Sequence, residues 1–414
     1  MDLEIKYGVA CGLDVHFAVI AACLVRTAPK GGPSYEERGF STTQRGLAEL
    51  RDWLVSSGCQ AVGMEATGVY WMPVYAALEQ QLPLVVGNPG HMKNLRGHKT
   101  DRKDAKWIAG LTRHGLIHPS FVPTPEFRDT RELTRSRRQL IEARSAVRNE
   151  ILRNLARKGI TLSDVLSNVF GVSGMGILEA LAEGRAVLTE LPKLVHRSVK
   201  GKLPALTAAL EAPLSEVSRN LLVIALKRLE ELEEHIQDVE ALIAKQMEPH
   251  QESLKLLMAI PGISLTSASI ILAEIGVDMS HWPTEKHLSA WAGLAPGSRE
   301  SGGKRMSASL RKGNTHLTTI LVEAASATVK SKTCHLAGVF HRLRGRMGYK
   351  KAIVAIARKL LVIIYHVLNA QKPYREPQPR PLNEKTKTRA IRKRVKDLEH
   401  MGFLVQLTPI PASA

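Results

Sequence analysis

The chain has 414 residues, enough for two or three domains with buried cores. Its 58 lysine and arginine residues outnumber 39 aspartate and glutamate residues, and the net charge of +19 predicts a polyanionic partner. A hydrophobic share of 44% excludes a wholly disordered or collagen-like chain. Aromatic residues make up only 5%, which argues against broad base-stacking surfaces as the main source of binding.

The spacing of the cysteines and the hydropathy of the chain indicate the cellular compartment in which the protein works. The four cysteines lie apart without a CxxC pair, which argues against zinc fingers and disulfide frameworks and favours a reducing compartment. The amino terminus lacks the basic segment of a signal peptide. Each long apolar run is interrupted by charged residues or by a Pro-Gly pair. We therefore expect a soluble prokaryotic protein of the cytoplasm, associated with the nucleoid when it acts and without a membrane partner.

Residues 1–120 alternate strand and helix patterns. The expected elements are strands at 9–14, 17–25, 35–41, 60–65 and 82–87, and helices at 42–57, capped by Thr43, and at 69–80. The first two strands are joined so closely that they predict a hairpin. Successive strands followed by strand–helix alternation predict an α/β domain with a mixed sheet flanked by helices.

Residues 121–250 are dominated by helical periodicity. Segments 126–158 and 203–247 carry apolar residues spaced by three and four, which predicts two long amphipathic helices. A stretch of short helices at 160–200 separates them. This arrangement predicts an antiparallel coiled-coil stalk that dimerises.

Residues 251–371 are predicted to form a compact, mainly helical domain. The sequence at 260–263 before a small-residue helix at 266–275 resembles one arm of a helix-hairpin-helix, whose glycine turn brings backbone amides to a phosphate. A glycine-rich basic loop at 297–314 precedes further helices. Residues 372–414 are rich in proline and basic residues and are predicted to be mainly a flexible tail.

Positive charge is concentrated in three segments. Basic residues outnumber acidic ones by 17 to 7 over 91–159, by 12 to 2 over 299–351 and by 10 to 2 over 372–396. Any one of these runs could be a solvated face, but three of them favour contact with nucleic-acid phosphates, with affinity that falls steeply with salt. The candidate contact residues are Lys99, Arg102, Lys103, Arg299, Lys304, Arg305, Arg311 and Lys312.

Four carboxylates form a candidate metal site. Asp14 lies in the first apolar strand and Glu65 ends the fourth, where an unpaired buried carboxylate would be costly. Asp101 and Asp104 are three residues apart and share one face of a helix. Such an all-oxygen set suits Mg²⁺, and two such ions can assist phosphoryl transfer. The alternative is structural: helix-terminal charges or ion pairs across the sheet.

A loop serine is the candidate nucleophile. Ser301 precedes two glycines, so its backbone can approach a phosphodiester closely, and Arg299, Lys304 and Arg305 can stabilise charge on phosphoryl oxygens. With no histidine nearby in sequence, a metal held by the carboxylates is the economical activator. The alternative is that Ser301 belongs to a flexible polar turn, since Ser-Gly-Gly is common in linkers.

These motifs resemble those of the DEDD insertion-sequence transposases, the bridge-RNA-guided recombinases of the IS110 family. The N-terminal motifs are Gly12-Leu13-Asp14-Val15-His16, Met64-Glu65-Ala66-Thr67-Gly68-Val69-Tyr70-Trp71, and Asn88-Pro89 through Lys99-Thr100-Asp101-Arg102-Lys103-Asp104-Ala105. The C-terminal motifs are Ile260-Pro261-Gly262-Ile263, Gly293-Leu294-Ala295-Pro296, Ser301-Gly302-Gly303-Lys304 and Lys312-Gly313-Asn314. The resemblance covers roughly residues 5–115 and 252–330.

The resemblance implies a fold and a mechanism. It implies an RNase H/RuvC-like N-terminal domain whose four acids, Asp14, Glu65, Asp101 and Asp104, bind Mg²⁺ or alternatively Mn²⁺. It also implies that Ser301 forms a covalent phosphoserine with DNA before strands are exchanged between donor and target. A noncoding bridge RNA would choose both DNAs. The enzyme would act as a dimer of dimers, with the acids and the serine of one active site coming from different protomers.

The chain departs from the family pattern in places, and other functions remain open. The insert at 160–215 and the tail after 372 are longer than the compact family form, and Leu317-Thr318 replaces a usual Leu-Arg pair. A RuvC-like nuclease that uses water, with Ser301 only shaping a loop, is the main alternative. A non-catalytic nucleic-acid-binding protein with structural acids is a third hypothesis.

Overall fold

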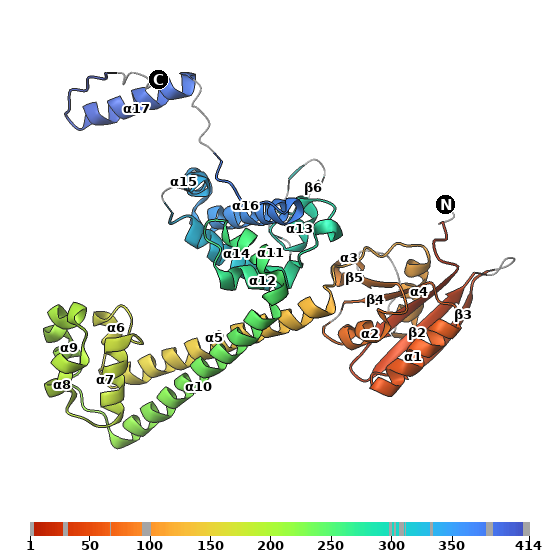
Figure 1. Ribbon diagram of the computed structural model, residues 1–414, viewed down its shortest axis with the longest axis horizontal. Coiled ribbons are helices and arrows are strands. Elements are labelled where there is room, and N and C mark those ends of the chain that lie inside the picture. The colour runs from red at the N-terminus through yellow and green to blue at the C-terminus, as the bar shows by residue number, and fades with distance from the viewer. Residues whose placement is uncertain are drawn as a thin grey trace. The chain divides into compact units, whose positions relative to one another are not determined.

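A computed structural model of the chain describes residues 4–27, 32–66, 68–92, 101–297, 300–301, 304–305, 310, 312–331, 334–377 and 384–408 (Figure 1). The chain divides into two compact units, Met1–Pro123 and Thr124–Ala414. The first unit is built on a mixed sheet, and the second is almost entirely helical among its described residues.

A five-stranded sheet organises the first unit. Its order is β3 (Ser34–Ser41), β2 (Val19–Arg26), β1 (Val9–Val15), β4 (Ala61–Glu65) and β5 (Leu84–Gly87). β1, β2 and β3 pair antiparallel, whereas β4 and β5 run parallel to β1. The predicted hairpin and mixed sheet are confirmed.

Helices cover both faces of this sheet. Helices α1 (Gln44–Ser56) and α2 (Trp71–Leu78) pack on one face, where Leu13 and Met64 join the buried cluster. Helix α4 (Asp101–Arg113) packs on the other, while α3 (Pro89–Met92) follows β5. The predicted cap of α1 is confirmed, because Thr43 Oγ1 accepts a hydrogen bond from the Gly46 amide at 3.2 Å.

Two long helices run antiparallel in the second unit. Helices α5 (Pro125–Ala156) and α10 (Glu216–Gln246) lie side by side in Figure 1. Their cross-helix ion pairs are Arg137–Glu240 at 2.5 Å, Arg144–Glu233 and Arg148–Glu233 at 2.8 Å, and Arg228–Glu150 at 3.3 Å. Partner numbers rise on one helix as they fall on the other, which fixes the antiparallel direction. The prediction that this pair forms a dimerising coiled coil stays a prediction.

The second long helix starts later than expected. The sequence predicted one helix from residue 203, but α9 (Leu203–Ala209) ends before Pro213, and α10 begins only at Glu216. Proline lacks the amide that a helix interior needs. Ser215 then caps the new helix by accepting a hydrogen bond from the Ser218 amide at 3.3 Å.

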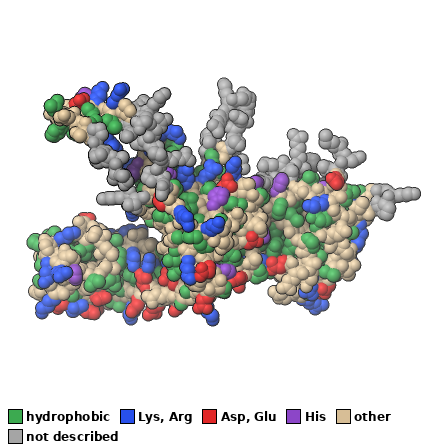
Figure 2. Space-filling view, turned by 45° about the horizontal axis from the view of Figure 1, so that its top comes forward, with side chains coloured by type: hydrophobic (Ala, Val, Ile, Leu, Met, Phe, Trp, Pro, Cys, Tyr) green, Lys and Arg blue, Asp and Glu red, His purple; other side chains and the backbone are tan. Residues whose placement is uncertain are grey.

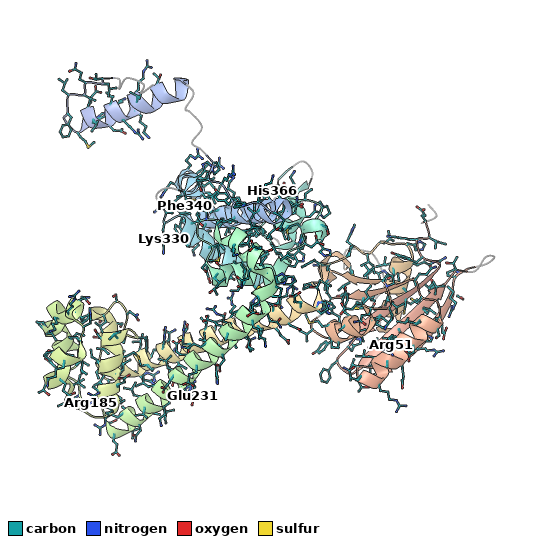
Figure 3. All side chains as sticks on the ribbon, viewed as in Figure 1. Arg51, Arg185, Glu231, Lys330, Phe340 and His366 are labelled. Carbon is teal, nitrogen blue, oxygen red and sulfur yellow. The ribbon has the colours of Figure 1, made fainter. Side chains whose placement is uncertain are left out.

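Short helices connect the long pair. They are α6 (Leu162–Val165), α7 (Val172–Ala182), α8 (Val187–Leu194), the 3-10 helix η1 (Arg197–Lys202) and α9. Their apolar side chains form one core with Ile151 of α5 and Leu222 of α10. In the turn after α7, Arg185 forms ion pairs with Glu183 at 2.6 Å and Glu190 at 3.0 Å (Figure 3). The insert is therefore a packed cap on the ends of α5 and α10.

The C-terminal helices form a bundle that includes one long apolar helix, α16 (Tyr349–Ala370). They are α11 (Gln251–Met258), α12 (Leu265–Ile275), α13 (Glu285–Trp291), α14 (Thr315–Thr328), α15 (His335–Met347) and α16, with 3-10 turns η2 (Glu248–His250) and η3 (Met279–His281). Of the helices in the described residues, α16 alone is long and apolar enough to cross a membrane. Buried residues such as Ile356 and Leu360 show it to be a core helix, packed against α11, α13, α14 and α15.

The turn between α11 and α12 has a packing role. Gly262 has a φ of +88°, and a Cβ there would lie 2.1 Å from Thr328 Oγ1 on α14. At the start of α12, Ser264 Oγ accepts a hydrogen bond from the Ser267 amide at 3.3 Å in a capping box. The helix-hairpin-helix resemblance thus corresponds here to a turn that packs against a neighbouring helix.

The tail contains a helix that the sequence analysis did not expect. Residues 372–414 were expected to be mainly flexible, yet helix α17 spans Glu384–His400. Lysine, arginine and glutamate are good helix formers, and they dominate this segment. The prediction that the tail as a whole is mainly flexible stays a prediction.

Candidate functional site

Two glycines bring α4 directly onto the strands that carry the candidate acids. A Cβ at Gly12 in β1 would lie 2.2 Å from the Ala105 carbonyl oxygen, and one at Gly63 in β4 would lie 2.0 Å from Thr112 Oγ1. Only glycine tolerates such contacts without a shift of the helix. The sequence around both acids therefore positions the helix as well as the carboxylates.

The direction of α4 brings its first turn to the carboxyl end of β1. The carbonyl of Arg113, at the end of α4, accepts hydrogen bonds from the Lys6 and Tyr7 amides at 3.0 and 3.1 Å, just before β1 begins. Because α4 runs opposite to β1, its amino-terminal residues lie toward the other end of that strand, where Asp14 is found. Asp104 immediately precedes Ala105, the residue that meets Gly12.

Strand alternation puts Asp14 and Glu65 on the face that α4 covers. Leu13 and Met64 are register partners on the α1–α2 face, so the next residue on each strand points to the opposite face. Asp14, Glu65 and Asp104 are all partly buried. Asp14 and Glu65 thus share one face and one edge of the sheet, and Asp104 lies in the first turn of the helix that covers that face.

The side chain of Asp101 lies outside the described residues, although its backbone begins α4. Asp14 Oδ2 lies 3.0 Å from His16 Nε2. Among the described side chains, no group of three histidines, cysteines, aspartates or glutamates is arranged to hold a metal ion. The donor chemistry still fits a hard divalent cation, since carboxylate oxygens are the ligands that Mg²⁺ prefers.

The candidate serine lies in a short hairpin of the second unit. Strands β6 (Glu300–Ser301) and β7 (Lys304–Arg305) pair antiparallel, with Ser301 opposite Lys304. At its stem, Pro296 and Leu310 form an isolated antiparallel bridge. The side chains of both strands lie outside the described residues. The acids and this serine belong to different compact units.

The carboxyl end of the serine loop is anchored by close packing. A Cβ at Gly313 would lie 2.3 Å from the Gly293 amide nitrogen, so the two backbones are in contact. Asn314 Oδ1 accepts a hydrogen bond from the Leu317 amide at 3.0 Å and caps α14. Thr318 Oγ1 donates to the Ala292 carbonyl at 2.7 Å. The Lys312-Gly313-Asn314 motif therefore fixes where the loop ends.

A buried charge network, which the sequence did not predict, extends this anchor to α5. Glu274 on α12 is fully buried and accepts two hydrogen bonds from Arg135 at 3.1 Å and one from Asn314 at 2.6 Å. Arg131 Nε lies 3.2 Å from Glu274 Oε2 and donates to the Ala273 carbonyl at 2.9 Å. The signal that could have revealed it is a single carboxylate inside the otherwise apolar helix 265–275.

Electrostatics keep this network charged. Burial alone would raise the pKa of the Glu274 carboxyl, but Arg131, Arg135 and the Asn314 hydrogen bond more than offset it and hold the pKa below its usual value. Burial lowers the pKa of Arg131 to about 10, so that guanidinium still carries its proton at neutral pH. A charged carboxylate with two cations is the stable form of the site.

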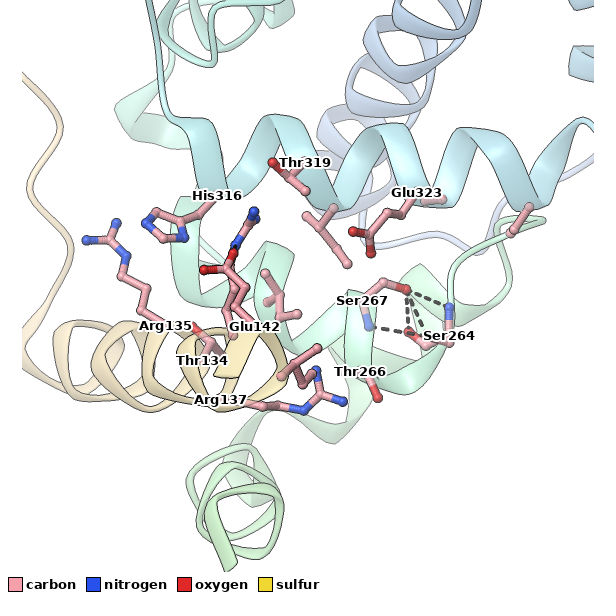
Figure 4. A pocket seen from close by; sticks show the side chains of 17 residues that line it. Thr134, Arg135, Arg137, Glu142, Ser264, Thr266, Ser267, His316, Thr319 and Glu323 are labelled. Carbon is pink, nitrogen blue, oxygen red and sulfur yellow. Dashed lines mark hydrogen bonds and ion pairs between the residues drawn. The ribbon is translucent and has the colours of Figure 1, made fainter. Parts of the chain in front are cut away.

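A pocket of about 640 Å³ lies between α5, α12 and α14 (Figure 4). Its α5 wall carries Arg135 and Arg138, and Arg138 forms an ion pair with Glu142 at 2.8 Å. His316 lines the α14 side, and its pKa is lowered by burial and by Arg135. Because these arginines have carboxylate partners, the pocket has mixed rather than strongly positive charge.

The predicted phosphate-binding residues are described unevenly. Lys312 is exposed. The positions or side chains of Lys99, Arg102, Lys103, Arg299, Lys304, Arg305 and Arg311 lie outside the described part of the chain. In Figure 2, acidic and basic side chains are interspersed rather than segregated on the visible face. The α5 arginines at 137, 144 and 148 are engaged with α10 glutamates, so the basic excess over 91–159 overstates the charge open to a ligand.

Comparison with known proteins places the chain among transposases. A family profile described as "Transposase" matches residues 11–159, and one described as "Transposase IS116/IS110/IS902 family" matches residues 254–339. The chain is 28% identical to the transposase for insertion sequence element IS1111A of Coxiella burnetii, over 77% of this chain and 79% of the relative. It is 27% identical to a probable family 20 transposase of Pseudomonas aeruginosa, over 79% and 89%. A putative transposase of Sinorhizobium fredii is 30% identical over 60% and 59%.

Proposed function

The chain belongs to the IS116/IS110/IS902 family of transposases, and from this premise we propose that it exchanges DNA strands through a covalent phosphoserine. Ser301 would be the nucleophile. A divalent metal ion held by Asp14, Glu65, Asp101 and Asp104 would assist the reaction. The observation that supports the proposal is that Asp14 and Glu65 share one face and edge of the sheet, under the first turn of the helix that carries Asp104. The strand order, with an antiparallel meander beside two parallel strands, supports an RNase H/RuvC-like fold for this unit.

The proposed metal site draws on oxygen donors from two strands and one helix. Magnesium, or alternatively manganese, would supply Lewis-acid stabilisation of charge on the phosphate and lower the pKa of the attacking hydroxyl. The protein's part is to hold the carboxylates at a fixed edge, which Gly12 and Gly63 achieve by letting α4 touch the sheet. His16, 3.0 Å from Asp14, orients that carboxylate.

The proposed chemical step is a phosphoryl transfer. The Ser301 oxygen forms a bond to phosphorus, the bond from phosphorus to a deoxyribose oxygen breaks, and the serine proton ends on that oxygen. Reversal with a different strand's hydroxyl restores the serine and joins the strands. The anchored stem of the loop supports this role, because a nucleophile must be held at a defined distance from phosphorus.

The proposed assembly is a dimer of dimers with a bridge RNA that chooses donor and target DNA. The net charge of +19 supports the binding of several nucleic-acid strands by one assembly. In the proposed assembly, the acids of one active site come from one protomer and the serine from another. On α10, Val217, Leu221 and Ile224 repeat at helical spacing and are 69%, 55% and 55% exposed, which supports a second copy packing along this helix.

The test is a covalent adduct. Full-length protein, bridge RNA and labelled donor DNA are incubated with Mg²⁺, denatured and resolved by electrophoresis. A DNA–protein adduct is expected for the natural protein and for Ser307→Ala, a serine control in the same loop, but not for Ser301→Ala. An adduct with Ser301→Ala would disprove the nucleophile. Cleavage by Ser301→Ala without an adduct would instead establish the water-dependent nuclease.

The acids are tested in the same assay. Asp104→Asn is expected to abolish adduct formation while leaving DNA binding in place, because the loss is of charge rather than of shape. Asp52→Asn is the matched control, since Asp52 lies on α1, where its Oδ1 forms a surface ion pair with Arg51 at 3.0 Å. Full activity of Asp104→Asn would remove the metal site from the mechanism.

A further inference from the structure

An exposed pair of aromatic rings lies at the sheet edge that carries the acids. The rings of Phe17 and Tyr70 meet edge to face, with centroids 5.8 Å apart and planes at 77°. Phe17 is 77% exposed and Tyr70 44%. In a chain with so few aromatic residues, a solvent-facing aromatic pair is unusual and points to contact with a ligand.

The chain connectivity ties each ring to one of the acids. Phe17 follows Asp14 by three residues in the turn from β1 to β2, and Tyr70 follows Glu65 by five residues, just before α2. Because β1 and β4 are adjacent and parallel, both rings lie beyond the carboxyl ends of the two acid-bearing strands.

Hydrogen bonds fix the turn that carries Phe17. Thr42 Oγ1 donates to the Phe17 carbonyl at 2.9 Å, and the His16 amide donates to the Val19 carbonyl at 2.9 Å. The ring is thus held in solvent by its backbone, close to His16, whose imidazole contacts Asp14. A preorganised ring loses little conformational freedom when it binds a flat partner.

We propose that Phe17 and Tyr70 stack on a nucleobase of the DNA strand next to the phosphate that is cleaved. In an edge-to-face pair, one ring keeps both faces clear of the other, so a face is open to a base. Every base offers a π face, so such a contact holds a strand near the acids without reading its sequence. The proposal rests on the proposed function only in taking the acids as the cleavage site.

A nucleobase suits this surface better than another protein. Val69 and Met72, which flank Tyr70 in the sequence, are also exposed, and the partly exposed carboxylate of Asp14 lies three residues before Phe17. A strand whose phosphate approaches those acids must place its adjoining bases alongside. Because the aromatic pair lies at the same edge of the sheet as the proposed cleavage site, a base of the bound DNA strand is the partner that we expect there.

The test compares two probes of equal length and charge, an oligothymidylate and its fully abasic counterpart, binding to the full-length protein in Ca²⁺. The natural protein is expected to prefer the base-containing probe by about tenfold, as the loss of one stacked base would give. Phe17→Ala, Phe17→Leu and Tyr70→Ala should lose that preference and keep their affinity for the abasic probe. Phe403→Ala, at a 63% exposed aromatic in the other unit, should retain it.

The outcomes separate this proposal from the phosphoserine mechanism. Ser301→Ala should keep the base preference even though it forms no adduct. Equal binding of both probes by the natural protein, or an undiminished preference in Phe17→Ala, would overturn the stacking role. Loss of self-association in Phe17→Ala, seen by light scattering without any base preference, would make the patch a protein interface and also overturn it.

Discussion

Asn314 Nδ2 donates a hydrogen bond to Glu274 Oε2 over 2.6 Å, and this single contact joins the end of the serine loop to the buried ion pairs of α5. The same asparagine caps α14 through its other side-chain atom, since Oδ1 accepts from the Leu317 amide. One residue therefore fixes both the start of a helix and the position of a loop. Glu274, although far from the sheet acids in sequence, is a positioning residue for the proposed nucleophile.

Glu274→Gln should destabilise the second unit by about 3 kcal/mol, because it leaves two partly buried guanidinium groups without their buried carboxylate partner. Urea unfolding measures the change. Glu142→Gln is the control: its pair with Arg138 is exposed, and its loss should cost about 0.2–1 kcal/mol. Similar losses for the two variants would contradict a dominant role for the buried site.

Acid should weaken the second unit through the same carboxyl group. The pKa of Glu274 is lower in the folded state than its ordinary value of 4.5, so its stabilising contribution is complete above that value. The contribution is lost as the pH falls through the folded pKa, because protonation removes the partner of Arg131 and Arg135. Unfolding free energies measured from pH 6 down to pH 2 should fall more steeply for the natural protein than for Glu274→Gln. Parallel curves would exclude this group as the cause.

Gly12→Ala should displace α4 and impair cleavage. The new Cβ would meet backbone atoms of Ala105 and Ala109 at 2.2 Å, and overpacking of this kind costs about 1–3 kcal/mol. Gly110→Ala, on α4 itself, meets no heavy atom within 4 Å and should be neutral or stabilising by about 0.5–1 kcal/mol. Thermal melting and the adduct assay follow both effects. An unchanged Gly12→Ala protein would show that the helix does not need its close approach.

Leu221→Lys should weaken self-association, since it puts a charge into the exposed apolar stripe of α10. Light scattering and sedimentation give the assembly state with and without RNA. Leu188→Lys, at a 44% exposed leucine of the insert, is the control expected to assemble normally. A Leu221→Lys protein with the natural assembly state would place the interface elsewhere.

Lys312→Ala should lower DNA affinity uniformly across sequences and reduce the slope of log affinity against log salt by about one, as the loss of one phosphate contact predicts. Lys312 is exposed and adjoins the anchored Gly313. Lys255→Ala removes a lysine that already pairs with Glu252 at 2.7 Å, and it should leave the slope unchanged. Binding titrations at several salt concentrations provide the comparison.

Local signals in the sequence predicted local structure well. Thr43 caps α1 as its position before an apolar period indicated, and the β1–β2 hairpin follows from two β-rich runs with almost nothing between them. The prediction of a single helix from residue 203 was wrong because it gave the apolar periodicity more weight than Pro213, which lies between the two observed helices.

Contacts between distant segments were beyond the reach of such signals. Asp14 and Glu65 were predicted as acids at strand ends, but their common face follows from the pairing of Leu13 with Met64 and from the glycines that admit α4. Glu274 was overlooked because its partner Arg135 lies 139 residues away, and nothing in periodicity pairs them. The charge count from the sequence likewise treated the arginines of α5 as free, whereas glutamates of α10 form ion pairs with them.

The ion pairs between α5 and α10 also encode their register. Arg137 meets Glu240 and Arg144 meets Glu233, but farther along the seam the signs reverse and Glu150 on α5 meets Arg228 on α10. A slip of one turn would carry Glu240 away from Arg137 and bring an uncharged side chain in its place. The charged side chains of α5 and α10 therefore favour one alignment of the two helices over alignments shifted by a turn, even where the apolar contacts alone would tolerate the shift.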